Sequence, residues 1–126
     1  MDLTEASAVI TGGASGIGEA SARKLSALGA RCVIVDLQDD KGEAVAKELG
    51  GLYVKADVAN EEQVQAAMDA AMEMGPLRAL VNGAGIGSAS RTVDRNGEPM
   101  PLAQFEFVIR VNLIGTFNCT RLGAAT

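Results

Sequence analysis

The sequence predicts an α/β domain with a doubly wound parallel sheet. Apolar runs of strand length alternate with segments of helical periodicity along all 126 residues. The run Arg31–Asp36 (RCVIVD) is apolar on both faces, as is typical of a strand that lies between two layers of helices. A glycine-rich turn, Gly12–Gly18, joins the first strand to the first helix. This alternation favours right-handed strand–helix–strand crossovers, which bring the carboxyl ends of the strands to one edge of the sheet.

The first strand and helix are predicted from their apolar spacing. Ala6–Thr11 is an apolar run of strand length. Gly29 ends the helix that follows, whose expected inward stripe recurs every three or four residues: Ile17, Ser21, Leu25 and Leu28.

The next elements follow the same pattern. After the strand Arg31–Asp36 comes a charged helix, Asp39–Leu49, which Gly50-Gly51 should close. Leu52–Ala56 is the expected third strand. Asn60 is the expected N-cap of a helix that runs to Met74, and Leu77–Asn82 is the fourth strand.

The last third of the chain departs from this rhythm. Gly83–Pro101 is a long irregular stretch, and loops of this length are usually functional or disordered. A helix over Leu102–Leu122 follows. It carries two apolar stripes and should therefore be buried on two sides, against the sheet and against more chain or a second subunit: Phe105, Ile109, Leu113 and Phe117 in one stripe, and Val108, Val111 and Ile114 in the other.

Composition excludes several classes of function. Eleven basic and sixteen acidic residues give a net charge of −5, which argues against nucleic acid or a membrane surface as a partner. Histidine is absent, so catalytic triads with His and His-ligated metal sites are excluded from this stretch. The two cysteines, Cys32 and Cys119, are far apart, and no metal site is expected. Together with an acidic start and no apolar run of roughly 18 residues, they indicate a cytoplasmic protein.

The glycine-rich turn is the strongest functional signal. Gly12, Gly16 and Gly18 have the spacing Gly-x-x-x-Gly-x-Gly between a strand and a helix. Glycines there let the backbone approach a pyrophosphate, whose charge meets the free N–H groups at the helix N-terminus. An ordinary strand-to-helix turn is the alternative interpretation.

Asp36, at the end of the second strand, indicates which dinucleotide binds. A carboxylate at this position accepts hydrogen bonds from both adenosine ribose hydroxyls and repels a 2′-phosphate. Leu37-Gln38 supplies no arginine to neutralise such a phosphate. NAD is therefore favoured over NADP, although a strand-end aspartate can also simply face water. Further polar or glycine-rich segments follow the third and fourth strands, Asp57-Val58 and Asn82–Gly85, at the edge where ligands of such sheets bind.

Taken together, these motifs resemble the N-terminal half of a short-chain dehydrogenase/reductase. The motifs that carry the resemblance span almost the whole chain, and they are Thr11–Gly18 (TGGASGIG), Asp36, Asp57-Val58, Asn82–Gly85 (NGAG) and Val111-Asn112. The resemblance implies a Rossmann fold over residues 1–126, with the remainder of the sheet missing. It also implies a set of cofactor-binding residues: Gly12, Ser15, Gly16, Ile17, Gly18, Asp36, Leu37, Asp57, Val58, Asn82, Gly83 and Ala84.

The resemblance assigns a role to several of these residues. Ser15 and Ile17 would contact the pyrophosphate side of the cofactor, and Asp57 and Val58 the adenine. Gly83 would contact the neighbouring ribose. The remaining two are asparagines: Asn82 would tie the fourth strand to the surrounding loops, and Asn112 would hold a water for the catalytic proton relay.

Within this family the sequence is most similar to the type-2 3-hydroxyacyl-CoA dehydrogenases, also called type-10 17β-hydroxysteroid dehydrogenases. The segments that carry this similarity are Ile10–Gly18, Ser88–Thr92 and Val111–Asn118. The similarity implies oxidation of a 3-hydroxyacyl-CoA by NAD in a homodimer or homotetramer. Arg91 or Arg95 could then meet a phosphate of coenzyme A.

Two departures from the family pattern leave other functions open. Gly83 stands where the family usually has a second asparagine. The catalytic Ser and Tyr-x-x-x-Lys of the family lie beyond the last helix, and the sole tyrosine, Tyr53, is followed four residues later by Asp57. We therefore expect this stretch alone to be inactive and to be the front part of a longer chain. The alternatives are a non-catalytic dinucleotide-binding module, a plain α/β assembly unit, and a dehydrogenase for a hydroxysteroid or another secondary alcohol.

Overall fold

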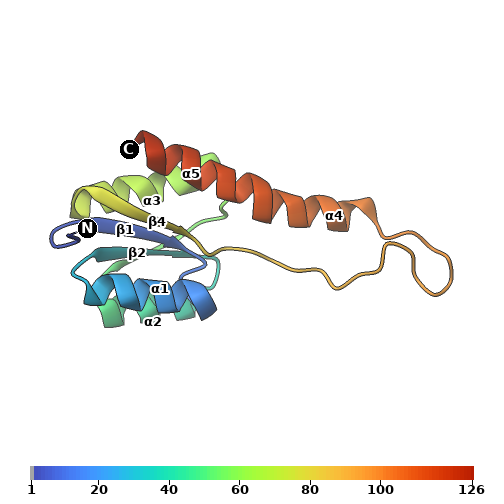
Figure 1. Ribbon diagram of the computed structural model, residues 1–126, viewed down its shortest axis with the longest axis horizontal. Helices are drawn as coiled ribbons and strands as arrows, with labels where there is room; N and C mark the ends of the chain where they lie inside the picture. The colour runs from blue at the N-terminus through green and yellow to red at the C-terminus, as the bar shows by residue number, and fades with distance from the viewer. Residues whose placement is uncertain (1) are drawn as a thin grey trace.

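The computed structural model describes residues 2–126 as a four-stranded parallel sheet covered by helices on both faces (Figure 1). The strands lie in the order β3-β2-β1-β4. Their bounds are β1 Ser7–Thr11, β2 Arg31–Asp36, β3 Leu52–Lys55 and β4 Leu77–Asn82, and the helices are α1 Gly16–Ala27, α2 Asp39–Leu49, α3 Glu61–Met74, α4 Leu102–Ile109, η1 Arg110–Gly115 and α5 Thr116–Ala125. The predicted fold class is confirmed, with strand bounds that differ by one residue at most.

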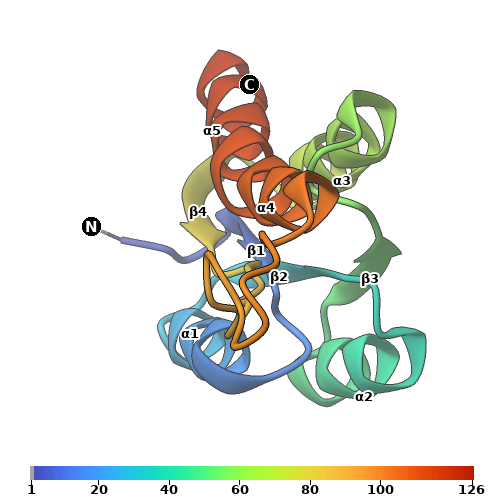
Figure 2. The ribbon, with the colours of Figure 1, turned by 90° about the vertical axis from the view of Figure 1, so that its right-hand side faces the viewer.

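The strand order places a topological switch point between β1 and β4. The chain winds outward from β1 through β2 to β3, then returns to the other side of β1 to form β4. Figure 2 shows α1 and α2 on one face of the sheet, and α3 with the α4–α5 rod on the other. Ligands of open α/β sheets bind at the carboxyl ends of the strands beside such a switch point.

Each strand contributes side chains to two hydrophobic cores. Val9, Val33 and Val35 pack with Met68 on the α3 side, where they are almost fully buried. Residues one position away, such as Ile34, pack on the α1–α2 side with Ala8, Ile10, Ala22 and Val45. The strands are apolar on both faces because a layer of helices covers each face of the sheet, as predicted.

Helix ends follow the predicted caps. The Asn60 side chain accepts a hydrogen bond from the backbone N–H of Gln63 at 3.0 Å, which satisfies one free donor at the start of α3. Gly50 ends α2 in the left-handed conformation, with φ of +63°.

Two of the four residues in the predicted stripe of α1 face outward, although Leu25 packs against the core. Ile17 is 83% exposed and Leu28 is 53% exposed, whereas Gly18 and Ala22 are buried. A Cβ atom at Gly18 would overlap the carbonyl oxygen of Gly12. The helix therefore packs through its smallest residues, because its first turn lies against the glycine-rich turn itself.

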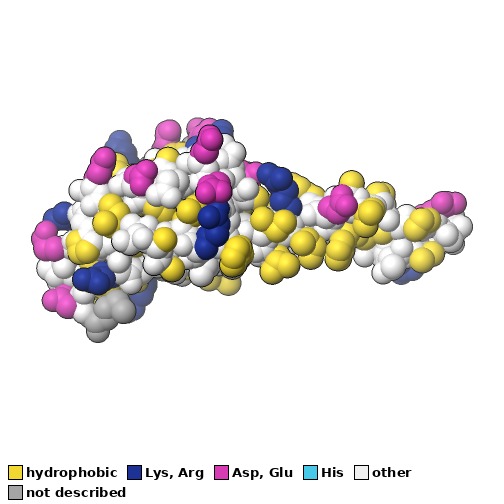
Figure 3. Space-filling view, turned by 90° about the horizontal axis from the view of Figure 1, so that it is seen from above, with side chains coloured by type: hydrophobic (Ala, Val, Ile, Leu, Met, Phe, Trp, Pro, Cys, Tyr) yellow, Lys and Arg dark blue, Asp and Glu magenta, His cyan; other side chains and the backbone are white. Residues whose placement is uncertain are grey.

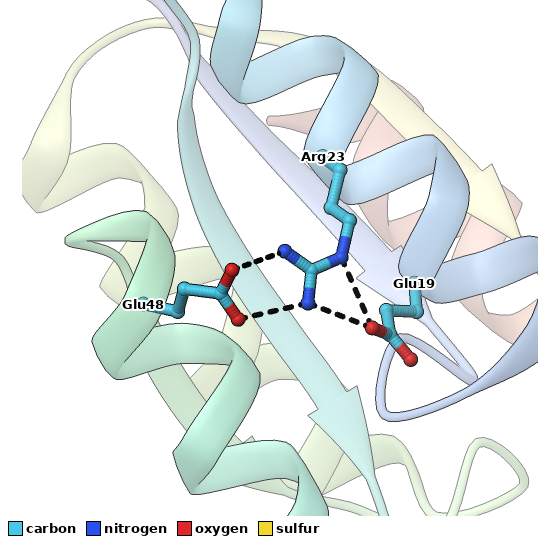
Figure 4. Close-up of polar contacts among 3 residues, drawn as sticks. All are labelled: Glu19, Arg23 and Glu48. Atoms are coloured by element: carbon cyan, nitrogen blue, oxygen red, sulfur yellow. Dashed lines mark hydrogen bonds and ion pairs between the residues drawn. The ribbon is translucent and has the colours of Figure 1, made fainter.

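An arginine links the two helices on that face. Arg23 of α1 donates hydrogen bonds to Glu19 at 2.8 and 3.0 Å, and to both carboxylate oxygens of Glu48 at the end of α2 (Figure 4). The groups are partly exposed, so we assign the cluster a modest stabilising role.

The segment between β4 and α4 is irregular, as predicted, and extends beyond the body of the sheet (Figure 1). Its one regular feature in the described residues is an antiparallel bridge between Val93 and Pro99.

The last helix is interrupted by a π-helical turn, which the sequence did not indicate. Arg110–Gly115 (η1) joins α4 to α5, and Gly115, Asn118 and Cys119 form its buried side. Ile114, a residue of the second predicted apolar stripe, is 51% exposed. A π-turn advances the helix by one extra residue, so it rotates the inward face relative to an uninterrupted α-helix. Within residues 2–126, no helix combines the length and the apolar character that a membrane crossing requires.

Candidate functional site

A cleft of about 510 Å³ lies at the carboxyl ends of the strands, beside the switch point. It brings together residues from the glycine-rich turn, the ends of β2 and β3, and the segment after β4. All of the predicted cofactor-binding residues except Asn82 line it: Gly12, Ser15, Gly16, Ile17, Gly18, Asp36, Leu37, Asp57, Val58, Gly83 and Ala84.

The glycine-rich turn forms the floor of the cleft because two backbones meet there without side chains. A Cβ atom at Gly12 would lie 2.6 Å from the carbonyl carbon of Gly83, and one at Gly83 would lie 2.6 Å from the carbonyl oxygen of Thr11. Glycine at position 83, where the family usually has asparagine, therefore belongs to this close approach. The result is an open cradle that a larger side chain would fill.

The N-terminus of α1 points its free backbone donors at this cradle. Ser15 occupies the N-cap position, is exposed, and makes no capping hydrogen bond within residues 2–126. The first N–H groups of a helix have no intrahelical partner and carry partial positive charge. The arrangement fits a pyrophosphate, since an anion there meets both the donors and the helix dipole.

Thr11 is a structural residue of the site to which the sequence analysis assigned no role beyond its place in the TGGASGIG motif. Its hydroxyl oxygen accepts a hydrogen bond from the N–H of Ala84 at 3.2 Å, and its backbone oxygen accepts one from the N–H of Gly83 at 3.0 Å. These bonds fix the segment after β4 to the end of β1. The signal available in the sequence was a polar residue at the last position of an apolar strand. In the structure this residue is buried.

Asp36 stands at the rim of the cleft with its carboxylate held by three backbone N–H groups. Oδ2 accepts from Ala14 at 3.1 Å, and Oδ1 accepts from Leu37 at 2.8 Å and from Gln38 at 3.1 Å. A carboxylate offers about four acceptor positions. One is therefore left for a further donor, such as a ribose hydroxyl, in a fixed orientation.

Asp57 and Val58 form the wall of the cleft that follows β3, next to the end of β2. The Oδ1 atom of Asp57 accepts from the N–H of Ala59 at 2.9 Å, and its Oδ2 lies 3.6 Å from the guanidinium of Arg110. The buried Asn118 side chain donates to the carbonyl of Val58 at 2.9 Å. The π-helical segment and α5 thereby hold this wall in place.

Asn82 and Asn112 do not line the cleft. The Asn82 amide donates to the hydroxyl of Thr120 on α5 at 3.2 Å, so it ties β4 to a helix rather than to the loops around it. Asn112 bonds the backbone of Ile86, a residue that does line the cleft. Both asparagines therefore affect the cleft only indirectly, through the segments to which they are hydrogen-bonded.

Seven lining residues were not predicted as site residues: Val35, Gln38, Ala56, Gly85, Ile86, Phe107 and Val111. Most of them lie next to a predicted residue in the chain, so their positions near the strand ends could have been used to predict them. Phe107 is different, because its place at the cleft depends on how α4 continues from η1 beyond the carboxyl ends of the strands (Figure 1).

Arg91 and Arg95 lie elsewhere, around a separate hollow of about 330 Å³ in the long loop. Asp94 and Glu98 line the same hollow, so its charge is mixed. In residues 2–126, no three His, Cys, Asp or Glu side chains gather where they could hold a metal ion.

Comparisons with known proteins give matches over most of the chain. The family profile described as short chain dehydrogenase matches residues 6–126. The chain is 46% identical over 121 residues to the 3-hydroxyacyl-CoA dehydrogenase type-2 of Rattus norvegicus, covering 93% of this chain and 46% of the relative. It is 41% identical over 118 residues to the mitochondrial borneol dehydrogenase of Lavandula x intermedia, covering 93% and 44%.

A solved structure resembles the fold as well. The crystal structure of 3-hydroxyacyl-CoA dehydrogenase type-2 from Mycobacterium avium matches with a TM-score of 0.90 and 45% identity, over 96% of this chain and 48% of that one. The chain thus spans about half the length of the curated relatives it matches.

Proposed function

Because the chain belongs to the short chain dehydrogenase family, we propose that it binds NAD in an oxidoreductase that oxidises a 3-hydroxyacyl-CoA to the 3-oxoacyl-CoA. NAD, when bound, supplies the nicotinamide ring that accepts the hydride. The observation that carries the proposal is the Asp36 carboxylate at the rim of a side-chain-free glycine cradle.

The chain's own residues would bind and orient the cofactor. The N–H groups at the start of α1 and the Ser15 hydroxyl would meet the pyrophosphate, with Ile17 packing beside it. Asp57 and Val58 would border the adenine, and Gly83 the ribose next to the nicotinamide. No residue of this chain is assigned the transfer of the hydroxyl proton itself.

Asn112 would support that transfer by holding a water. Both of its side-chain amide atoms bond Ile86, so this role would fall to its backbone carbonyl. That carbonyl already accepts the Thr116 hydroxyl at 2.7 Å and has a second lone pair for a water.

NAD is proposed over NADP because of the charge at the rim. A 2′-phosphate would approach the Asp36 carboxylate, and the exposed neighbours Leu37 and Gln38 supply no positive charge. Lys55, the nearest cation on the adjoining strand, is paired with Asp39 at 2.8 Å.

A 3-hydroxyacyl-CoA is the proposed substrate because the relatives of that name share 41–47% identity with this chain. A secondary alcohol of another kind is the second candidate, supported by the 41% identity to a borneol dehydrogenase. A coenzyme A phosphate could reach Arg91 or Arg95 in the long loop only beside Asp94 and Glu98.

We also propose that the protein forms a homodimer or homotetramer in the cytoplasm. An apolar face along α4–α5 supports the assembly; Figure 3 shows hydrophobic side chains along the projecting part of the molecule. The outward residues of this face are Leu102, Phe105, Leu113, Ile114 and Phe117. Two buried free thiols support a reducing compartment.

The test is cofactor binding by the full-length protein, measured by isothermal titration calorimetry. We expect NAD to bind more tightly than NADP, and Asp36→Ala to weaken NAD about 10- to 100-fold, as for a lost hydrogen bond to a charged group. Asp40→Ala, which removes an exposed carboxylate in the first turn of α2, is the matched control and should bind NAD normally.

Turnover then distinguishes the candidate substrates. Oxidation of a 3-hydroxyacyl-CoA in preference to borneol or a hydroxysteroid supports the first candidate, and the reverse preference supports the second. NAD binding without turnover on any of them would indicate a non-catalytic dinucleotide-binding module. No NAD binding at all would contradict the proposal and leave an α/β assembly unit.

A further inference from the structure

Tyr53 of β3 bridges the two ends of the turn that follows Asp36. Its hydroxyl lies 3.0 Å from the backbone oxygen of Asp36 and 2.8 Å from Oδ1 of Asp39, the first residue of α2. Its ring packs so closely on α2 that a Cβ atom at Gly42 would overlap it. One hydroxyl therefore contacts the last residue of a strand and the first residue of the next helix.

The hydroxyl is held as a permanent donor. Removal from water and the hydrogen bond to Asp39 raise the pKa of Tyr53 above its usual value. The Lys55 ammonium, and then the Tyr53 hydroxyl, lower the pKa of Asp39, which stays a carboxylate. The single O–H proton is thus shared between the Asp39 carboxylate and the Asp36 carbonyl.

The turn so fixed is the one that shapes the rim of the cleft. The Asp36 carboxylate takes two of its three hydrogen bonds from the turn's own N–H groups, at Leu37 and Gln38. Leu37 and Gln38 themselves line the cleft. Movement of the turn would therefore change the direction in which Asp36 presents its remaining acceptor position.

We infer that Tyr53 is a positioning residue for the Asp36 carboxylate, and that it sets the preference of the cleft for a nucleotide with a free ribose 2′-hydroxyl. The inference rests on the proposed function, since it names what holds the proposed ribose-binding group in place. Tyr53 acts through Asp36 and does not itself line the cleft.

The test compares NAD and NADP binding to the full-length protein by isothermal titration calorimetry. Tyr53→Phe keeps the ring on Gly42 and removes only the hydroxyl. We expect it to raise the Kd for NAD about 3- to 10-fold, the range for one lost hydrogen bond. The Kd for NADP should not rise in parallel, so the ratio of the Kd for NADP to the Kd for NAD should fall. In the active enzyme, KM for NAD should rise while kcat is unchanged.

Two further variants separate positioning from general stability. Glu48→Gln weakens the Arg23 cluster away from the cleft (Figure 4), and it should lower the unfolding temperature without changing the ratio of the Kd for NADP to the Kd for NAD. Gly42→Ala retains the hydroxyl but displaces the ring, and it should lower the ratio as Tyr53→Phe does.

The outcomes are distinct. Failure of the wild-type protein to prefer NAD overturns the proposed function, and the inference with it. If the wild type prefers NAD and Tyr53→Phe keeps the same ratio, the inference alone is wrong, whatever Gly42→Ala does. An unchanged ratio in which both cofactors bind equally more weakly would assign Tyr53 a merely structural role.

Discussion

The side chain of Asn112 pairs with the backbone of Ile86 as one strand residue pairs with another. The N–H of Ile86 donates to Oδ1 of Asn112 at 2.8 Å, and Nδ2 of Asn112 donates to the oxygen of Ile86 at 2.8 Å. The pair joins the π-helical segment to the start of the long loop, which lines the cleft. Beyond the end of β4, this side-chain amide thus provides hydrogen-bond partners like those that a neighbouring strand provides within a sheet.

Replacing Asn112 by leucine should release this part of the loop. Leucine has a similar size but no polar atoms, so Ile86 would lose two exposed hydrogen bonds, each worth about 0.5 to 1.5 kcal/mol. We expect faster amide hydrogen exchange at Ile86, measured by NMR. Asn96→Leu, at an exposed position in the same loop, is the control. Equal exchange in the two variants would mean that the Asn112 pair does not hold the loop.

Gly83→Ala should be far more disruptive than Gly87→Ala. A Cβ atom at Gly83 would lie 2.6 Å from the Thr11 oxygen, whereas one at Gly87 meets no atom within 4 Å. We expect Gly83→Ala to lower the free energy of unfolding by about 1 to 3 kcal/mol, as overpacking does. Gly87→Ala should stay within about 0.5 kcal/mol of the wild type. Denaturant unfolding measures both, and similar values would contradict the close approach seen here.

Cys119 should be inert to thiol reagents in the folded protein. Burial raises its pKa to about 11, above the ordinary 9.0. At pH 8 only about a thousandth of the thiol is then ionised, and the thiolate is the reactive form. Folding therefore favours the neutral thiol. The contribution of Cys119 to the free energy of unfolding is complete below pH 9, and it is lost as the pH rises towards 11.

The measurement is labelling with a chromogenic disulfide reagent at pH 8. Native protein should show no reaction at either buried cysteine, and denatured protein should react at both Cys32 and Cys119. Cys119→Ala should remove its part of the stability loss above pH 9. Rapid labelling of the native protein would show that α5 opens readily.

The apolar face of α4–α5 should be needed for assembly. Leu113 and Phe117 are 62% and 66% exposed, and burying each in an interface would contribute about 1.5 to 3 kcal/mol. We expect Leu113→Ser with Phe117→Ser to shift the full-length protein to a smaller mass in light scattering. Met72→Ser, at an exposed methionine on α3, is the control. An unchanged mass would mean that this face does not hold subunits together.

Much of the fold and cleft could be predicted because the responsible signals are local. The alternation of apolar runs located the strands, and Asn60 and Gly50 located helix ends through their own backbone chemistry. Asp36 was recognisable as a strand-end carboxylate that follows a glycine-rich turn. Thr11 was assigned no role of its own, because its partner Ala84 is 73 positions away in the chain.

The errors share a cause as well. The stripe of α1 was assigned from hydrophobicity, but Gly18 faces the core because only glycine fits against Gly12. The two apolar stripes of the last helix were assigned from an uninterrupted helical period, and the π-turn at Arg110–Gly115 shifts that period partway along the helix.

The sequence by itself determined the order of strands and helices, the glycine-rich turn and the acidic residue beside it. Periodicity and turn chemistry act over a few residues, so they can be read along the chain. Only the tertiary structure decided that Gly83 meets Gly12, that Asn112 pairs with Ile86, and that the Tyr53 hydroxyl spans the turn after Asp36. These contacts depend on how closely distant segments of the chain pack around the sheet. The spacing of residues along one segment does not reveal the distance between segments.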